Sequence, residues 1–158
     1  MLLESHRELG WESGWFNYAV RVQPQHTDYA GIVWHGTYLN WMEAARVECL
    51  RSSGVGFEEL VAAGFNLPVV AISLRYHQSI SMGENVAVMT RIAKPEKLRL
   101  NWEYEIRTID RLCVTATVSL IAVDMSKGKI LRVLPKVLED SIDKITHSQS
   151  ASMASANL

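Results

Sequence analysis

The sequence has no long hydrophobic run, few cysteines and no excess of one charge, and each of these absences excludes a class of protein. No apolar stretch reaches the length that spans a membrane, and the residues MLLESHRELG at the start lack the features of a signal peptide. With 16 basic and 17 acidic residues, the net charge of -1 gives no footprint for nucleic acid or an anionic membrane. We therefore expect a cytoplasmic protein whose partner is a small molecule.

The two cysteines, Cys49 and Cys113, show neither CxxC spacing nor histidine-rich metal spacing, so we expect free thiols that pack in the core. A chain of 158 residues, 48% of them hydrophobic, is long enough for one domain with a full core but leaves no room for a separate cofactor domain. We assign this domain to residues 1–145. Residues 146–158 are small and polar, and we expect them to form a disordered tail.

Periodic hydrophobicity predicts one long helix among strands. From Tyr38 the apolar residues recur three or four positions apart, which is typical of an amphipathic helix, and this pattern ends before Gly54. Residues 57–63 predict a second, short helix that a glycine stops. Pro135 is expected to open a terminal helix that runs through Ile145.

The rest of the chain is mostly predicted as strands. Residues 98–107 alternate between apolar and polar side chains, a period of two that places one strand face on a core and the other towards water. Further strands are expected after Pro68 and at residues 16–23, 86–92, 113–123 and 130–134. This order describes an α+β protein in which a curved antiparallel sheet of about five strands wraps round a long central helix.

Residues 28–38 read DYAGIVWHGTY, in which one carboxylate precedes a glycine-bearing turn and the start of the long helix. Gly31 gives the chain access to backbone conformations that cost other residues free energy. Asp28 is expected beside the helix N-terminus, where unpaired N–H groups and the helix dipole favour negative charge. Hydrolysis of an acyl group needs both parts, a group that activates or is the nucleophile and donors for the carbonyl oxygen.

This segment resembles the 4-hydroxybenzoyl-CoA thioesterase-like branch of the hotdog superfamily, whose pattern Asp-x-x-Gly-hydrophobic-Val-x-(His/Tyr)-x-x-Tyr precedes a helix carrying Glu-Ala-x-Arg. The residues in register are Asp28, Gly31, Ile32, Val33, His35, Tyr38, Glu43, Ala44 and Arg46. The resemblance extends to about residue 138. It implies a hotdog fold and an acyl-CoA thioesterase that needs no cofactor or metal. It also implies a site between subunits, and hence a homodimer or a dimer of dimers.

The resemblance implies catalytic roles for three residues of the motif. Asp28 would attack the thioester carbonyl or activate a water molecule that does so, and the sequence leaves both routes open. His35 would donate its backbone N–H to the thioester oxygen, because the family also allows tyrosine at this position. Tyr38 is the third candidate, with packing in the core as the alternative. The residues expected to line the substrate site are Gly31, Val33 and Trp34.

Coenzyme A carries phosphates that need cations at the mouth of the site. The densest basic stretch between strands contains Lys94, Lys97 and Arg99, and we predict that these residues bind the phosphates. An ordinary solvated turn is the alternative for each of them.

Other polar residues near the motif have structural explanations. Glu43 and Arg46 are one helical turn apart, the spacing of a surface ion pair, but Arg46 falls at the edge of the apolar stripe and needs a partner there. We expect Arg46 to be a structural or interface residue and Glu43 to be the second candidate for the catalytic acid. His26, Asp28 and His35 lack a recognised zinc or facial-triad spacing, so no metal is expected.

Two other functions stay open beside thioester hydrolysis. One is a hotdog dehydratase that acts on acyl carrier protein, although a catalytic histidine paired with a helix acid is not present in the expected form. The other is a silent protein that binds acyl-CoA without releasing the thiol. The aromatic residues Trp34, Tyr38, Trp41 and Phe65 offer surface that either cradles an aryl group or fills the core and the interface, so branched, medium-chain and aromatic acyl groups all stay open. We expect an aromatic or medium-chain acyl-CoA to be turned over faster than acetyl-CoA, because a two-carbon acyl group leaves an apolar pocket unfilled.

Overall fold

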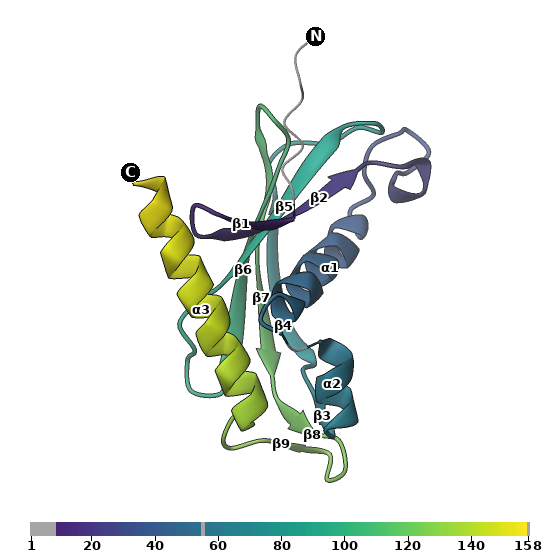
Figure 1. The fold of residues 1–158 in the computed structure, drawn as a ribbon. Coiled ribbons are helices and arrows are strands. Elements are labelled where there is room, and N and C mark those ends of the chain that lie inside the picture. The colour runs from purple at the N-terminus through teal and green to yellow at the C-terminus, as the bar shows by residue number, and fades with distance from the viewer. Residues whose placement is uncertain (1–8, 55, 158) are drawn as a thin grey trace.

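The structure, a computed structural model that describes residues 9–54 and 56–157, is built on an antiparallel sheet of six strands in the order β1-β2-β5-β6-β7-β4 (Figure 1). These strands are β1 Gly10–Glu12, β2 Trp15–Arg21, β5 Asn85–Ile92, β6 Arg99–Arg107, β7 Leu112–Ile121 and β4 Val69–Tyr76. The alternation along β6 buries Leu100, Trp102, Tyr104 and Ile106 and turns the polar residues between them to the open face. The predicted α+β class and wrapped sheet are confirmed, although β1 was not expected.

The central helix α1, Thr37–Arg51, packs its apolar stripe against β2 and β5. Met42, Ala45 and Cys49 on this stripe are buried, as the periodicity predicts. Burial raises the pKa of the Cys49 thiol well above its ordinary value, which fits a packing role and not that of a nucleophile. Cys113 is likewise buried and free. The chain turns away after α1 at Gly54, whose φ of +91° lies in the region that favours glycine.

A short helix and a small sheet cover one end of the main sheet. The helix is α2, Phe57–Ala62, close to its predicted bounds. The small sheet has three strands, β3 Phe65–Asn66, β8 Val123–Asp124 and β9 Lys129–Ile130. The strand predicted at residues 113–123 is therefore divided between β7 and β8, because the chain leaves β6 after Ile121 and pairs with β3 and β9 instead. The strand predicted at residues 130–134 is wrong except at its first residue.

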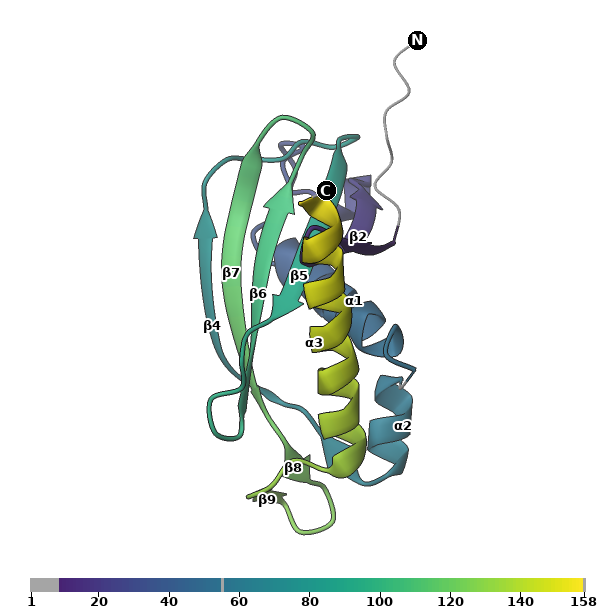
Figure 2. The same cartoon turned by 60° about the vertical axis from the view of Figure 1, so that its left-hand side comes forward.

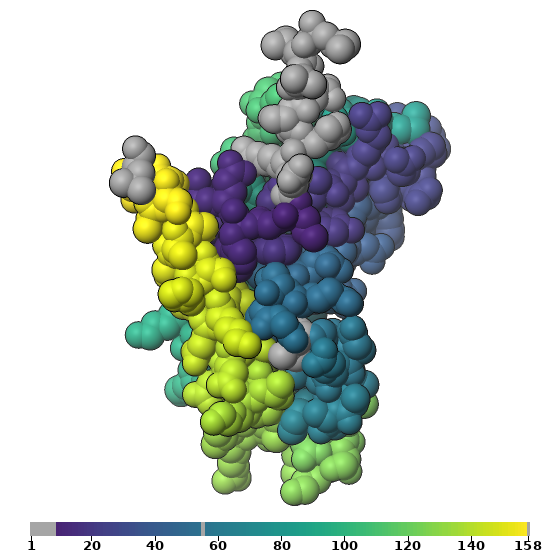
Figure 3. Space-filling model, viewed as in Figure 1, coloured from purple at the N-terminus to yellow at the C-terminus, as the bar shows by residue number. Residues whose placement is uncertain are grey.

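The terminal helix α3 runs from Lys136 to Ala156, well beyond the predicted end at Ile145. It lies on the same side of the sheet as α1 (Figure 2). Its last turns lie against the hairpin of β1 and β2 (Figure 3). The prediction of a disordered tail at residues 146–158 is thus wrong for the described residues.

Two polar side chains hold the last turns of α3 by bonding to backbone groups of the sheet and of the turn between β1 and β2. The Gln149 side chain accepts from the Ile92 N–H at 3.3 Å and donates to the Ile92 carbonyl at 3.2 Å. The Ser152 hydroxyl accepts from the Gly14 N–H at 2.9 Å. These bonds satisfy backbone groups at the end of β5 and in the turn between β1 and β2.

Replacing Gln149 with alanine is expected to lower the free energy of unfolding by about 1–3 kcal/mol, the usual cost of a buried backbone group without a partner. Urea denaturation measures this difference. Ser150→Ala is the matched control, because Ser150 is exposed on the same helix. Equal unfolding midpoints for the two variants would show that the end of α3 adds nothing to stability.

Candidate active site

Asp28 is the first residue of the turn 28–31, in a tight loop that closes on itself. The Asp28 N–H donates to the Ile32 carbonyl at 2.8 Å, and the Gly31 N–H donates to the Asp28 carbonyl at 3.1 Å. A bridge between Thr27 and Val33 closes the base of the loop. Gly31 has a φ of +76°, so the turn requires the conformational freedom that the sequence analysis assigned to this glycine.

The Asp28 carboxylate uses one of its two oxygens to order the loop. Oδ1 accepts from the Ala30 N–H at 2.9 Å and from the Ile32 N–H at 3.3 Å, which is an Asx turn. No hydrogen bond among the described residues engages Oδ2. The side chain is exposed. The carboxylate is therefore oriented by one oxygen and leaves the other available to a substrate or a water molecule.

The start of α1 is fixed by hydrogen bonds to carbonyl groups of the residues that precede it. The short 3-10 helix η1, Pro24–His26, comes just before the loop, and its His26 carbonyl accepts from the Trp34 N–H at 3.0 Å and the Thr37 hydroxyl at 2.8 Å. The Thr37 N–H donates to the Trp34 carbonyl at 2.9 Å. Within the described chain, neither the His35 N–H nor the Gly36 N–H donates to a protein acceptor. These two donors are free at the helix N-terminus, where a developing negative charge is favoured.

Aromatic rings surround the start of the helix. Tyr38 is buried, and its ring lies 5.5 Å from that of Trp41 and 5.6 Å from that of Tyr76. Burial raises the pKa of Tyr38 to about 12, so its hydroxyl stays protonated at neutral pH and cannot act as a base there. The Trp34 ring lies beside that of His35 and is half exposed, whereas Val33 belongs to the buried core.

Segment 79–84 lies beside the Asp28 loop and binds it through backbone hydrogen bonds. The Val33 N–H donates to the Ile80 carbonyl and the Met82 N–H donates to the Gly31 carbonyl, both at 2.9 Å. This segment contains no catalytic motif of recognisable spacing, so the sequence does not predict its role. Its contact with the loop became visible only in three dimensions.

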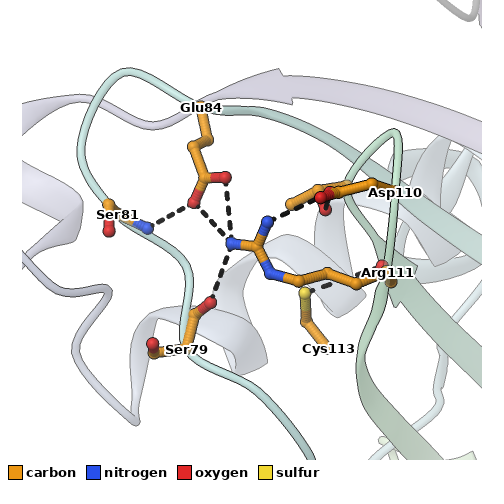
Figure 4. A network of polar contacts seen from close by, with 7 residues as sticks. Ser79, Ser81, Glu84, Asp110, Arg111 and Cys113 are labelled. Atoms are coloured by element: carbon orange, nitrogen blue, oxygen red, sulfur yellow. Dashed lines mark hydrogen bonds and ion pairs between the residues drawn. The ribbon is translucent and has the colours of Figure 1, made fainter.

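Arg111 fixes the shape of this segment (Figure 4). Its Nη2 donates to both oxygens of the Glu84 carboxylate, at 2.9 and 2.8 Å, and to the Ser79 carbonyl at 3.0 Å. Its Nη1 donates to the Asp110 carboxylate at 3.1 Å. Glu84 in turn accepts from the Ser81 N–H at 2.7 Å. The ion pair with Glu84 raises the pKa of Arg111, and the network ties both ends of the segment to the turn before β7.

The basic loop predicted to bind phosphates lies far from Asp28 within one chain. Lys94 and Lys97 are exposed in the turn between β5 and β6, and Arg99 is exposed at the first position of β6, where it pairs with Glu96 and closes the turn. This turn follows the end of β5, whereas segment 79–84, which contacts the Asp28 loop, precedes its start. Figure 1 shows the turn at the opposite end of the sheet from the loop before α1. The structure therefore does not bring these cations to Asp28 in a single copy.

A cavity of about 220 Å³ lies between the second half of α1 and the sheet. Its apolar lining comes from α1, α3 and the strands, and includes Val47, Leu50, Leu67, Leu120, Leu138 and Ile142. Pro68 and Val69, where β4 begins, also line it. An engineered apolar cavity of about 150 Å³ is known to bind benzene, so this space is large enough for an aromatic ring or a short aliphatic chain.

Glu43 and Arg46 line the polar side of this cavity without forming an ion pair with each other. Arg46 donates instead to the Tyr104 hydroxyl at 2.9 Å. This bond supplies the partner that the sequence analysis required for Arg46, and it joins α1 to β6. Glu43 is exposed.

Neither a metal cluster nor a membrane helix is present among residues 9–54 and 56–157. No group of three or more His, Cys, Asp and Glu side chains in these ranges is placed to hold a metal ion. No helix there is both long and apolar enough to cross a bilayer.

Comparison with known proteins identifies the family. A family model described as the thioesterase-like superfamily matches residues 22–140, a span from just after β2 into α3. This chain belongs to the thioesterase-like superfamily. The enzyme is 49% identical over 133 residues to sll0410 of Synechocystis sp., which carries a provisional esterase name, with 83% of this chain and 80% of that protein covered.

Two further relatives carry thioesterase names. The acyl-CoA thioester hydrolase YbgC of Escherichia coli O6:H1 is 28% identical to the enzyme over 122 residues, which covers 77% of this chain and 90% of that protein. A DHNA-CoA thioesterase from Staphylococcus aureus matches in structure with a TM-score of 0.72 and 26% identity, and covers 90% of this chain and 93% of that one. The predicted family, hotdog fold and enzyme class, a thioester hydrolase, are confirmed. The roles of the individual site residues stay predictions.

Glu84→Gln is expected to reduce activity more than stability, because it weakens the network that holds the Asp28 loop. Glu105→Gln is a matched control: Glu105 pairs with Arg107 at 2.8 Å with similar exposure, but it does not contact segment 79–84. Each variant should lose at most about 1 kcal/mol of stability, the range for partly exposed ion pairs. Only Glu84→Gln should lower kcat in a steady-state assay. Equal kcat values for the two variants would argue against a role of this network in the site.

Proposed function

We propose that the enzyme hydrolyses acyl-CoA thioesters and that Asp28 is its catalytic carboxylate. The observation that carries this proposal is that one segment, residues 28–36, holds both an Asp28 Oδ2 and two N–H groups at the start of α1 that have no partner within the described chain. A carboxylate oxygen and backbone donors are the two parts that acyl transfer needs. The acyl-CoA thioester hydrolase name of the Escherichia coli relative supports the substrate class.

Either of two routes is compatible with this arrangement. In the first, Asp28 Oδ2 bonds to the thioester carbon, the C–S bond breaks, and CoA leaves as a thiolate that takes a proton from water. Water then hydrolyses the resulting anhydride and restores the carboxylate. In the second, Asp28 takes a proton from a water molecule while the water oxygen bonds to the thioester carbon. The C–S bond then breaks, and the proton passes from Asp28 to the departing thiolate. In both, the His35 N–H would stabilise the negative charge on the carbonyl oxygen.

The proposed acyl group is aromatic or of medium chain length. The apolar cavity beside α1 supports this, because a two-carbon acyl group would leave most of it unfilled. An assay of free CoA against a panel of acyl-CoA thioesters tests it, and acetyl-CoA as the best substrate would contradict it. The same assay separates the alternatives: a silent binder would bind acyl-CoA without thiol release, and a dehydratase would act on the acyl chain and leave the thioester intact.

We also propose that the enzyme works as a homodimer or a dimer of dimers that is joined through β4. This edge strand carries four exposed large hydrophobic residues, Val69, Val70, Ile72 and Tyr76. Exposed edges of this kind pair with other chains unless they are blocked. Antiparallel pairing of two β4 strands about a two-fold axis would cover both edges. The strands of the partner's sheet would then run in the opposite direction to those of the first sheet.

This reversal would combine features that are separated in one chain. The start of β4, which lines the apolar cavity, would approach the end of the other β4, next to the other Asp28 loop. The turn that carries Lys94, Lys97 and Arg99 would then lie at the same end of the assembly as the other chain's Asp28. The proposed phosphate contacts therefore depend on the proposed assembly.

Asp28→Asn is expected to abolish most turnover while it preserves the fold. Asparagine keeps an oxygen that accepts from the Ala30 and Ile32 N–H groups but loses the charge. Loss of acid–base assistance lowers kcat by about a hundred- to ten-thousandfold, and loss of a nucleophile costs at least as much. KM should change little.

His35→Ala is the comparison for this variant. If only the His35 backbone acts, this substitution should keep far more activity than Asp28→Asn. If Asp28→Asn retains activity within about tenfold of the parent, below the range for a lost acid–base group, the assignment is wrong and Glu43 and His35 become the next candidates.

The assembly is tested by placing a charge on the edge strand. Ile72→Lys should weaken association and activity together, because both depend on the pairing of β4. Light scattering and the CoA assay report the two effects. Val133→Lys, at an exposed hydrophobic position outside the sheet, is the control. A parent protein that is monomeric at micromolar concentration and fully active would contradict the shared site.

A further inference from the structure

Tyr76, the last residue of β4, makes a contact that the proposed mechanism has not used. Its hydroxyl donates to the backbone carbonyl of His35 at 2.8 Å, across 41 positions of sequence. The ring also lies against that of Tyr38, which holds it in place independently of the hydroxyl. The contact therefore reaches from the edge of the sheet to the residue before the N-cap of α1.

A hydrogen bond to this carbonyl fixes the orientation of the next N–H group. The peptide unit is planar, and in its trans form the N–H points opposite to the C=O. The His35 carbonyl and the Gly36 N–H belong to one such plane, which Tyr76 holds. The preceding plane contains the Trp34 carbonyl and the His35 N–H, and the Thr37 N–H holds it through that carbonyl. Two consecutive planes are thus each fixed by their oxygen, while their N–H groups stay free.

The hydrogen bond also strengthens the Gly36 N–H as a donor. Hydrogen bonds in a chain polarise one another, so a carbonyl that accepts a bond makes the N–H of the same peptide more acidic. A Cβ at position 36 would lie 2.3 Å from the Trp34 ring, so a larger residue there would displace this ring. The ring packs over Gly36, and no side chain of residue 36 stands beside its N–H.

We infer that the Gly36 N–H acts beside the His35 N–H as a second donor to the thioester oxygen, and that Tyr76 is the positioning residue that orients it. This inference rests on the proposed thioester hydrolysis at Asp28. It adds to that proposal a second backbone donor and a side chain, on the edge strand, that acts on the chemistry without touching the substrate.

Tyr76→Phe tests the inference because it removes the hydroxyl and keeps the ring. Tyr76 is 55% exposed, so its hydrogen bond contributes little to the stability of the fold. Removing an oxyanion donor outright costs about a hundred- to a thousandfold in kcat. Disordering one should cost less, and we expect kcat to fall about tenfold, with KM, the melting temperature and the assembly state nearly unchanged.

Tyr18→Phe is the matched control. Tyr18 is half buried on β2, and its hydroxyl makes no hydrogen bond with a described residue. This variant should keep the kcat of the parent. A similar loss in both variants would mean that the effect of Tyr76→Phe is not specific, and would overturn the inference.

NMR gives a second measurement that does not depend on turnover. Among the 5 histidines of the chain, only His35 is followed by glycine. Labelling histidine with 13C at the carbonyl and glycine with 15N therefore gives one signal, from the His35–Gly36 peptide. In Tyr76→Phe both the His35 carbonyl shift and the Gly36 amide shift should move, because the hydrogen bond to that carbonyl is lost. An unchanged signal would overturn the inference.

The outcomes separate this inference from the proposed function. A parent protein that releases CoA from no thioester overturns both. A parent that hydrolyses thioesters and depends on Asp28, together with a Tyr76→Phe variant of parental kcat, overturns only the role of Tyr76. A variant with a lower melting temperature and a raised KM would reveal a merely structural role and would also overturn it. A fall in kcat alone, with a shifted Gly36 signal, supports it.

Discussion

Two backbone hydrogen bonds, from Val33 to Ile80 and from Met82 to Gly31, attach the Asp28 loop to the rest of the molecule. They act together with the loop's own turn and with the burial of Val33 in the core. Ile80 is completely buried, so segment 79–84 cannot shift without disturbing the core. The loop therefore gains the rigidity of the sheet although it lies outside any regular strand, and a functional group needs such support to keep its geometry.

Around this attachment, most polar groups have a structural partner. One oxygen of Asp28 orders its own turn, and the carbonyls of Trp34 and His35 accept from Thr37 and Tyr76. The groups without protein partners within the described chain include one oxygen of Asp28 and the N–H groups of His35 and Gly36. Each of these groups is held in place by a neighbouring atom: Asp28 by its other oxygen, and the two peptide units by their carbonyl oxygens. The candidate site is thus defined by the capacity for hydrogen bonding that the fold does not use.

The parts of this arrangement that the sequence could predict are the local ones. The turn at Gly31, the amphipathic helix and the strand alternation at residues 98–107 all depend on residues close in the chain. Tyr76 and Arg111 were missed because their partners lie 41 and 27 positions away and depend on the register of the sheet. The error at residues 146–158 has the same cause. The polar composition of this segment predicts disorder because it offers little apolar surface to bury. Gln149 and Ser152 are nevertheless ordered by hydrogen bonds to the backbone of Ile92 and Gly14, which are distant in the sequence. The basic turn at Lys94 was recognised as a pattern, but the sheet places it at the opposite end from the Asp28 loop within one chain, which depends on the fold and not on the local sequence.

The bond between Gly14 and Ser152 joins residues 138 positions apart. During synthesis the hairpin of β1 and β2 leaves the ribosome early, but this support becomes available only after nearly all of the described chain has been made. Contacts between such distant residues form late, because a long loop must close first. Until α3 has been made, the Gly14 N–H of the hairpin lacks its partner on Ser152. The growing chain therefore passes through a stage in which its first strands are exposed to other nascent chains, and the last turns of α3 end that stage.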